Sequence, residues 1–186
     1  YIPTEDTIVD ALNNVLNTVI TVCKENNLKA NKLWLEKILA DIYVDKLAVK
    51  YNYHEEPFKL NPIIGEFDDP NNQRQDLLTI NLTNDGNTSV YGSSGSGKEL
   101  LFTSMIYSLV TNHTPDEVNI YILDFGSGTL GSFRNIPHVG DFILPSEEDK
   151  INNIFKMLDE ELEKRKKLFV NFNGDYQTYV NKSGST

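Results

Sequence analysis

A glycine-rich octapeptide, Gly92 to Glu99, constrains this chain more than any other feature. It keeps the spacing G-x-x-x-x-G-K, which is typical of a loop that holds phosphate. A β-prone stretch at 87–91 leads into the octapeptide, and an apolar, helix-compatible run at 100–110 follows it. Strand, glycine loop and helix in this order predict an α/β fold. A flexible Gly/Ser linker is the alternative, but linkers are not normally flanked by apolar runs on both sides.

The chemistry of the octapeptide favours an anionic ligand. Glycines let the backbone curl so that several N–H groups point into one hollow, at a helix N-terminus where the dipole favours negative charge. Lys98 adds a positive charge that can reach the β and γ phosphates of a nucleotide. The candidate nucleotide-binding residues are Gly92, Ser93, Ser94, Gly95, Ser96, Gly97, Lys98, Glu99 and Leu100.

Glu99 departs from this motif, because the eighth position usually carries a Ser or Thr whose hydroxyl binds Mg²⁺. A carboxylate can also bind a hard cation through oxygen, but without metal it repels phosphates of the same sign. The sequence therefore predicts a nucleoside triphosphate as the ligand and Mg²⁺ as a candidate cofactor. It favours weak or absent hydrolysis, and it identifies no catalytic residue and no definite metal ligand.

The composition excludes several classes of protein. The chain has 186 residues, enough for a domain with a hydrophobic core, and no apolar run approaches the roughly 20 residues of a membrane span. Cys23 is the single cysteine, which excludes an intrachain disulfide and favours a reducing compartment. The net charge of −10 disfavours DNA as a partner. The chain starts without Met or a signal peptide, and we expect a fragment of a longer protein.

The N-terminal third of the chain has a helical pattern. Apolar residues recur at three- and four-residue steps over 5–26, which predicts an amphipathic helix. A second helical or mixed segment is expected over 33–42, before a polar connector at 51–57. We expect residues 1–59 to form a helical segment packed on the core, with partner binding by the first helix as the alternative.

Strands and turns are predicted in the first part of the second domain, residues 60–186. Strands are expected at 62–67, 77–82 and 118–124, and turns at 68–72 and 84–87. The third strand ends in Asp124, which we expect near the nucleotide pocket, with contact to the metal as the sharper alternative. Strands that alternate with helices predict a mostly parallel sheet flanked by helices.

A long helix is predicted to follow Ser146, which is expected to serve as its N-cap ahead of acids in the first turn. Its basic run, 164–167, lies near the helix end, where the helix dipole favours cations. A solvated helix end is the simpler interpretation of this run, and a specific anionic partner is the alternative.

Four segments together resemble the FtsK/SpoIIIE-type P-loop ATPases. They are the octapeptide, residues 121–126, residues 135–139 with their Pro-His pair, and residues 160–165, which keep an E-x-x-x-R spacing. Residues 64–75 resemble a segment that precedes the P-loop in ATPase modules of type VII secretion coupling proteins, the EssC/EccC family. The resemblance covers about residues 60–182, and the combination is more specific than the glycine loop alone.

This resemblance implies a RecA-like P-loop core, ATP binding, and a role as a soluble module of a membrane-anchored motor on the cytoplasmic face of the cell membrane. It implies three kinds of partner: neighbouring ATPase modules of the same chain, other membrane components of the secretion system, and small WXG100-type secreted substrates. A homo-hexamer is the candidate assembly of the full-length protein.

Three departures from the family bear on hydrolysis. Glu99 replaces the hydroxyl, Phe125 and Gly126 stand where translocases often carry Pro-Lys, and the second acidic motif is expected after Thr186. A module that holds ATP without efficient turnover is therefore favoured. The alternatives are a protein or DNA translocase that becomes active on oligomerisation, with Arg74 as a candidate arginine from a neighbour, and a docking platform that needs no nucleotide.

Overall fold

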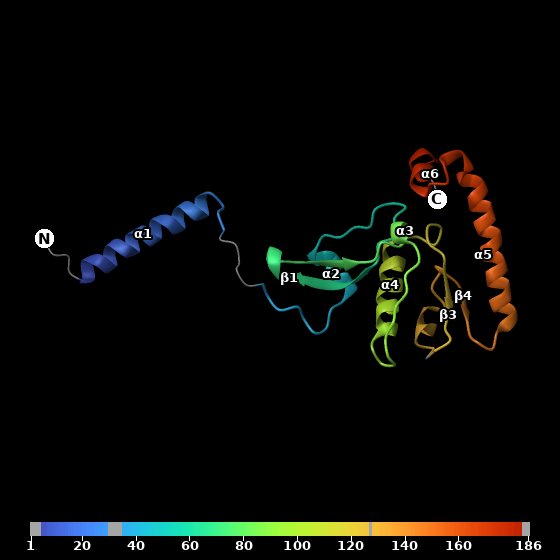
Figure 1. The fold of residues 1–186 in the computed structure, drawn as a ribbon. Helices are drawn as coiled ribbons and strands as arrows, with labels where there is room; N and C mark the ends of the chain where they lie inside the picture. Colours follow the sequence, from blue (N-terminus) through green and yellow to red (C-terminus); the bar gives the residue numbers. More distant parts are fainter. Residues whose placement is uncertain (1–4, 30–34, 127, 184–186) are drawn as a thin grey trace. The chain divides into compact units, whose positions relative to one another are not determined.

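The computed structural model describes residues 5–29, 35–126 and 128–183 (Figure 1). It divides into two compact units, of which the first comprises residues 1–37 with 70–74 and the second residues 38–69 with 75–186. None of the described helices is both long and apolar enough to cross a membrane.

The first unit contains helix α1 (Glu5–Glu25), which confirms the amphipathic helix expected over 5–26. The hydroxyls of Thr18 and Thr21 each donate to the carbonyl four residues earlier at 2.8 Å, as helical threonines commonly do. The large apolar residues of this helix are 46 to 60 % exposed: Ile8, Val9, Leu12, Val15, Leu16, Val19, Ile20 and Val22. The packing of this helix on the core stays a prediction.

The second predicted helix does not form where its pattern indicated. Residues 35–43 have no helix or strand, and 33–34 lie outside the described residues. Helix α2 (Val44–Lys50) begins later and buries Leu47. Lys50 and the neighbouring Tyr51 both donate hydrogen bonds to Glu66, so tertiary contacts, rather than the apolar spacing at 33–42, fix this helix.

Strands β1 (Ile63–Asp69) and β2 (Arg74–Thr79) form a two-stranded sheet and are joined by the 3₁₀ turn η1 (Pro70–Asn72). Both strands were expected, with bounds that differ by a few residues. The turn expected at 84–87 is instead the short helix α3 (Leu82–Asp85). Asn81 caps this helix by accepting a hydrogen bond from the backbone N–H of Asn84 at 3.1 Å.

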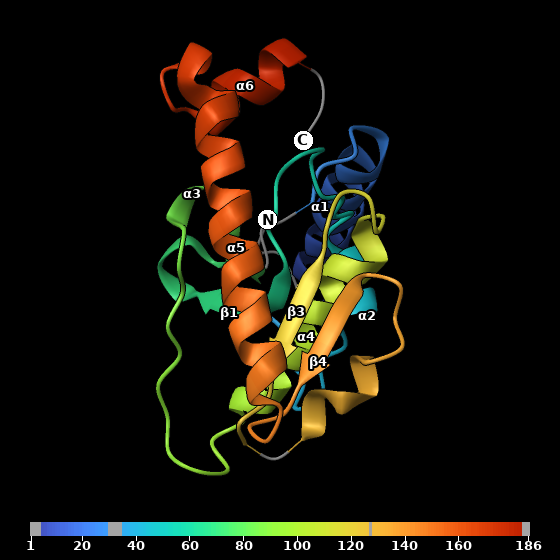
Figure 2. The same cartoon turned by 90° about the vertical axis from the view of Figure 1, so that its right-hand side faces the viewer.

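The core of the second unit lies around the parallel pair β3 (Ile120–Leu123) and β4 (Val139–Ile143). This pair lies between α4 (Lys98–Asn112) and α5 (Glu148–Phe169) in two views of the ribbon (Figures 1 and 2). The 3₁₀ helix η2 (Thr129–Phe133) precedes β4. The central buried residues are Ile106, Ile122, Phe133, Val139 and Phe142. Helices flanking a parallel pair confirm the α/β class in its coarse form.

The strand expected at 87–91 does not form. Residues 86–97 connect α3 to α4 without helix or strand, and neither two-stranded sheet includes them. A strand is stable when a neighbour pairs with its N–H and C=O groups, and β-prone residues alone do not supply that neighbour. Tyr91, at the end of this stretch, is 91 % exposed.

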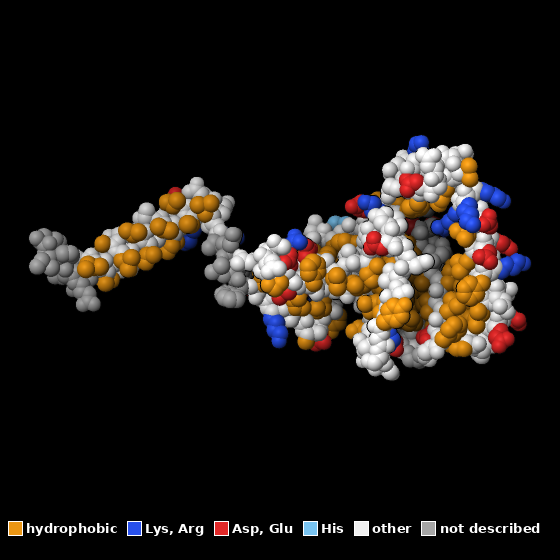
Figure 3. All heavy atoms as spheres, in the orientation of Figure 1, with side chains coloured by type: hydrophobic (Ala, Val, Ile, Leu, Met, Phe, Trp, Pro, Cys, Tyr) orange, Lys and Arg blue, Asp and Glu red, His pale blue; other side chains and the backbone are white. Residues whose placement is uncertain are grey.

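Helix α5 starts one residue later than predicted, and Glu147 rather than Ser146 occupies the N-cap. The Glu147 carboxylate accepts a hydrogen bond from the backbone N–H of Leu144 at 2.9 Å, which fixes the chain ahead of the helix. Ile154 of this helix is buried and Ile151 is half-buried. Apolar side chains on its outer face, Phe155, Leu158 and Leu162, are exposed (Figure 3). The 3₁₀ turn η3 (Val170–Phe172) and helix α6 (Tyr176–Ser183) follow.

Candidate functional site

The glycine loop and the start of α4 form one local structure. Lys98 is the first residue of α4, and its ammonium folds back over the loop. Its Nζ donates to the carbonyl oxygens of Gly92 and Ser93 at 2.8 and 2.6 Å and lies 3.4 Å from Ser96 Oγ. The residues at the two ends of the octapeptide are therefore brought together, as the motif predicts.

Two glycines make this curl possible. Gly95 and Gly97 have φ of +74° and +87°, in the left-handed region that side chains with a Cβ rarely adopt. At Gly92 the constraint is space, because an added Cβ would collide with the Ser96 side chain. The loop conformation thus depends on glycine at 95 and 97, whereas a side chain at 92 would require the Ser96 side chain to shift.

The start of α4 is suited to an anion. Gly97 is the N-cap residue and gives no side-chain hydrogen bond to the first turn, where an Asp or Ser would satisfy an N–H group. The loop residues 92–97 are exposed, so an outside acceptor can reach these N–H groups. Free donors, the positive end of the helix dipole and the Lys98 ammonium fit the phosphates of a nucleotide.

Glu99 and Leu100 lie on the first turn of α4. The Glu99 side chain is half-buried, and its backbone carbonyl accepts a hydrogen bond from Thr103 at 2.8 Å. Leu100 is 70 % exposed. The first turn of α4 therefore carries a carboxylate, not a hydroxyl, at the position that directly follows Lys98. Within the described residues, no group of three or more His, Cys, Asp or Glu side chains is arranged for a metal ion.

Asp124 follows β3, and the turn that contains it lies at the same end of the core as the glycine loop (Figures 1 and 2). Its backbone N–H donates to Ile143 at 3.0 Å, and its Oδ1 accepts from the backbone N–H of Gly126 at 2.9 Å. These bonds stabilise the turn and hold the carboxylate in it. The recorded contacts of Asp124 do not include Lys98, so its part in the pocket stays a prediction.

Residues 49–183 match the FtsK/SpoIIIE family. The chain belongs to this family. It is 37 % identical over 102 residues to the ESX secretion system protein YukB of Bacillus subtilis, a match that covers 55 % of this chain and 7 % of YukB. It is 27 % identical over 138 residues to the type VII secretion system protein EssC of Staphylococcus aureus. That match covers 73 % of this chain and 9 % of EssC.

A solved structure supports the same assignment. The chain matches Thermomonospora curvata EccC (ATPases 2 and 3), a structure in complex with a signal sequence peptide, with a TM-score of 0.59 and 31 % identity. The match covers 69 % of this chain and 24 % of that one. The resemblance to type VII secretion ATPases is thereby confirmed. The chain spans less than a tenth of the two curated relatives named above.

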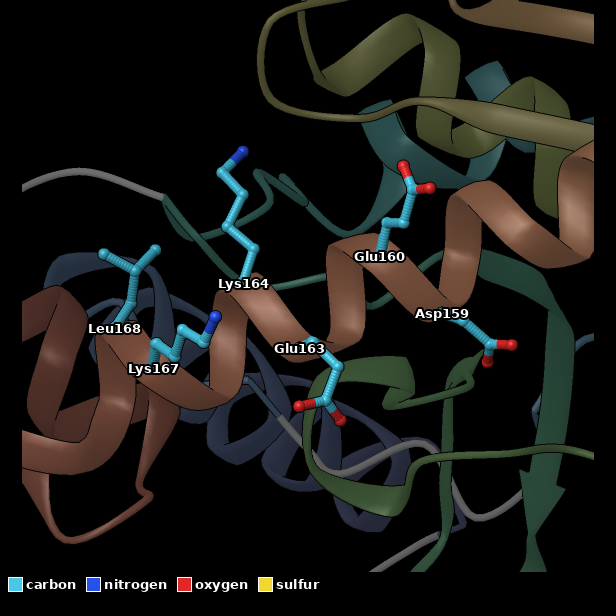
Figure 4. Close-up of a pocket in the computed structure, with 6 residues that line it drawn as sticks. All are labelled: Asp159, Glu160, Glu163, Lys164, Lys167 and Leu168. Atoms are coloured by element: carbon cyan, nitrogen blue, oxygen red, sulfur yellow. The ribbon is translucent and has the colours of Figure 1, made fainter.

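A shallow hollow lies along α5 of this FtsK/SpoIIIE-family chain, away from the glycine loop (Figure 4). It is lined by Asp159, Glu160, Glu163, Lys164, Lys167 and Leu168. Glu160 and Lys164 point to one side of the helix and Asp159 and Glu163 to the other. These side chains diverge and come from one helix, so they do not converge on a ligand. The basic run 164–167 is likewise engaged locally, since Lys164 and Arg165 pair with Glu161.

One buried group was missed from the sequence. His113, expected to lie in a loop, and Glu55, expected in a polar connector, pair at 2.9 Å with side chains 5 % and 1 % exposed. Neither motif spacing nor local periodicity signals this pair, because the two residues come from segments far apart in the chain.

Proposed function

We propose that this chain is an ATP-binding module of a type VII secretion motor. The observation that carries the proposal is the loop geometry: glycines at positive φ, an uncapped helix start and Lys98 folded over the loop, within a family match over 49–183. ATP would bring the phosphates that these groups suit, and Lys98 would exchange two backbone carbonyls for phosphate oxygens.

The proposed module holds nucleotide without efficient turnover. Glu99 places negative charge where the family motif expects an Mg²⁺-binding hydroxyl, and this opposes the phosphates unless a cation lies between them. Binding would then act as a structural or regulatory state of the motor. The proposal also includes a RecA-like core, a hexameric assembly and attachment to the cytoplasmic face of the membrane. Its proposed partners are neighbouring ATPase modules, other secretion-system membrane components and WXG100-type substrates. The signal sequence peptide bound to EccC supports a peptide-binding role for such motors.

A hydrolysis-competent translocase is the second candidate. It is favoured by Asp124, whose carboxylate lies after β3 at the loop end of the core, where it could serve a metal ion. Exposed Arg74, the first residue of β2, is its candidate arginine for a neighbouring subunit. Steady hydrolysis that survives Glu99→Ala but is lost in Lys98→Ala would favour this candidate.

A titration with a fluorescent ATP analogue, with and without Mg²⁺, tests nucleotide binding. Lys98→Ala is expected to raise the Kd by at least about tenfold, or 1.4 kcal/mol. Lys156→Ala, which removes an exposed lysine from α5, is the control and is expected to leave the Kd unchanged. Lack of binding by the unmodified chain at millimolar analogue would refute the proposal, and equal binding by Lys98→Ala would move the site elsewhere.

A further inference from the structure

A cluster of buried polar groups lies at the end of α4 opposite the glycine loop. His113 is the C-cap residue of α4, and its Nε2 lies 2.9 Å from Glu55 Oε2. Its Nδ1 lies 3.8 Å from Glu117 Oε2, whose side chain is 39 % exposed. The carbonyl oxygen of His113 lies 2.8 Å from the Nε2 of buried His138. The C-terminal end of α4 is therefore held both through the imidazole ring of His113 and through the backbone carbonyl of that residue.

Burial makes the contact between Glu55 and His113 energetically important. A buried carboxylate costs several kcal/mol unless hydrogen bonds or an opposite charge compensate it. Glu55 Oε1 accepts from the backbone N–H of Asn61, which leaves Oε2 to face the imidazole. Those two atoms lie close together without hydrogen-bond geometry, and they form an ion pair when the imidazole carries a proton. Removing one partner would leave the other buried without compensation.

Other ionisable groups surround this pair. Tyr53 lies close by in sequence, and its burial, together with the charges of Glu55 and Glu56, raises its pKa to about 12. Glu56 is itself paired with Lys59 at 2.5 Å. The charge that faces His113 thus comes from Glu55, on the connector before β1, and from Glu117, in the loop before β3.

Helix α4 links this cluster to the glycine loop. The hydrogen bonds recorded for Gly92, Ser93 and Ser96 run to Lys98 or within the loop, and the loop is exposed. The position of the loop is therefore set by the helix that it precedes. That helix is held near its C-terminal end, by the buried residues Ile106, Ser108 and Leu109 and by His113.

We infer that Glu55 and His113 are positioning residues for the phosphate-binding loop, because their buried pair fixes the end of the helix that carries Lys98. The inference rests on the proposed nucleotide site. A helix of 15 residues transmits a shift or tilt at its C-terminus to its N-terminus, since its internal hydrogen bonds keep it stiff. Loss of the pair therefore displaces donors that must meet phosphate oxygens at defined distances.

The test compares Glu55→Gln, His113→Gln and the double variant with the unmodified chain. Each single variant is expected to raise the Kd of a fluorescent ATP analogue about tenfold, because one buried group loses its partner. The double variant replaces both groups with neutral amides and is expected to recover to within about threefold of the unmodified chain. Asp116→Asn, at an exposed carboxylate in the same loop, is the control and is expected to bind normally.

Hydrogen exchange of the amides at 92–100, measured without nucleotide, gives a second readout on folded protein. Exchange is expected to be faster in the single variants and near normal in the double variant. The inference would be overturned if both single variants kept the Kd and the exchange rates of the unmodified chain, or if the double variant did not recover. In either case a raised Kd in Lys98→Ala would still support the nucleotide site itself. If the unmodified chain binds no nucleotide, the proposed function fails, and unchanged loop exchange then refutes the positioning role independently.

Discussion

The backbone N–H of Ile63 donates to the hydroxyl of Ser108 at 2.9 Å, across 45 positions of sequence, and both residues are fully buried. This bond joins the first residue of β1 to the middle of α4. It satisfies the buried backbone donor at the start of the strand, and it gives the buried Ser108 side chain a hydrogen-bond partner inside the core.

Replacing Ser108 with Ala is expected to lower the free energy of unfolding by about 1–3 kcal/mol, since the buried N–H of Ile63 would lose its acceptor. Urea denaturation measures this. Ser104→Ala, at a half-buried serine on the same helix, is the control and is expected to change stability by less than about 0.5 kcal/mol. Equal effects at both serines would show that the bond is not the cause.

A second prediction concerns Gly140, which is skipped in the register of β3 and β4 because Ile120 pairs with Val139 and Tyr121 with Asp141. An added Cβ at Gly140 would lie 2.6–2.8 Å from carbons of the Tyr121 ring. Gly140→Ala is expected to destabilise the protein by about 1–3 kcal/mol through overpacking. In a Tyr121→Val background the same change should cost much less, and an undiminished cost would disprove this explanation.

The third prediction concerns backbone conformation in the loop. Gly97→Ala forces a side chain into φ of +87° and is expected to cost about 1 kcal/mol in stability and to weaken nucleotide binding. Gly65→Ala is the matched control, because an added Cβ there meets nothing within 4 Å. Differential scanning calorimetry and the ATP-analogue titration provide the two readouts, and parallel losses in both variants would contradict the loop geometry.

The fourth prediction concerns the carboxylate at position 99. Glu99→Gln is expected to tighten Mg²⁺-free nucleotide binding about fivefold, because one like charge near the phosphates is worth about 1 kcal/mol. Glu99→Thr should do the same and also gain affinity when Mg²⁺ is added, since it restores a hydroxyl ligand. Titrations with and without Mg²⁺ separate the two effects. If both variants bind like the unmodified chain, Glu99 does not face the phosphates.

The fifth prediction is a loss of stability at alkaline pH. The pKa of Tyr53 is raised from 10.0 to about 12 by burial and by the charges of Glu55 and Glu56, and its hydroxyl donates to the Asn61 carbonyl at 2.6 Å. The unfolded chain releases the Tyr53 proton first, so the stabilisation is complete below pH 10 and is lost as the pH rises toward 12.

The stability advantage of the unmodified chain over Tyr53→Phe should therefore shrink between pH 10 and 12 in urea unfolding experiments. Tyr91→Phe, at a tyrosine that is 91 % exposed, should show no such change. A Tyr53→Phe difference that is constant with pH would argue against the buried hydroxyl as the source.

Local signals in the sequence predicted much of the fold. Helix α4 follows the glycine loop as expected, and β3 and α5 occur close to their predicted bounds, because apolar periodicity records which face of an element is buried. Strand β4 was not predicted, although Val139, Phe142 and Ile143 are buried. It is only five residues long, and a short apolar run gives a weak periodic signal.

The errors share a physical cause. The stretch 87–91 has β-prone residues but no strand beside it, and the segment 33–42 has helical spacing but no helix over 35–42. In both places the expected element would depend on partners that local sequence does not specify. Helix α2, in contrast, is short but buries Leu47 and bonds to Glu66.

By itself the sequence determined the chemistry of the glycine loop: the three glycines, Lys98 at the helix start and the carboxylate at Glu99 are all properties of eight consecutive residues. Only the tertiary structure decided what lies behind that loop. The bond from Ile63 to Ser108 and the pair of Glu55 with His113 join segments 45 or more positions apart, and no local pattern encodes such distances. Contacts of this kind depend on how whole elements pack, because burial makes a partner obligatory without specifying where in the chain it comes from.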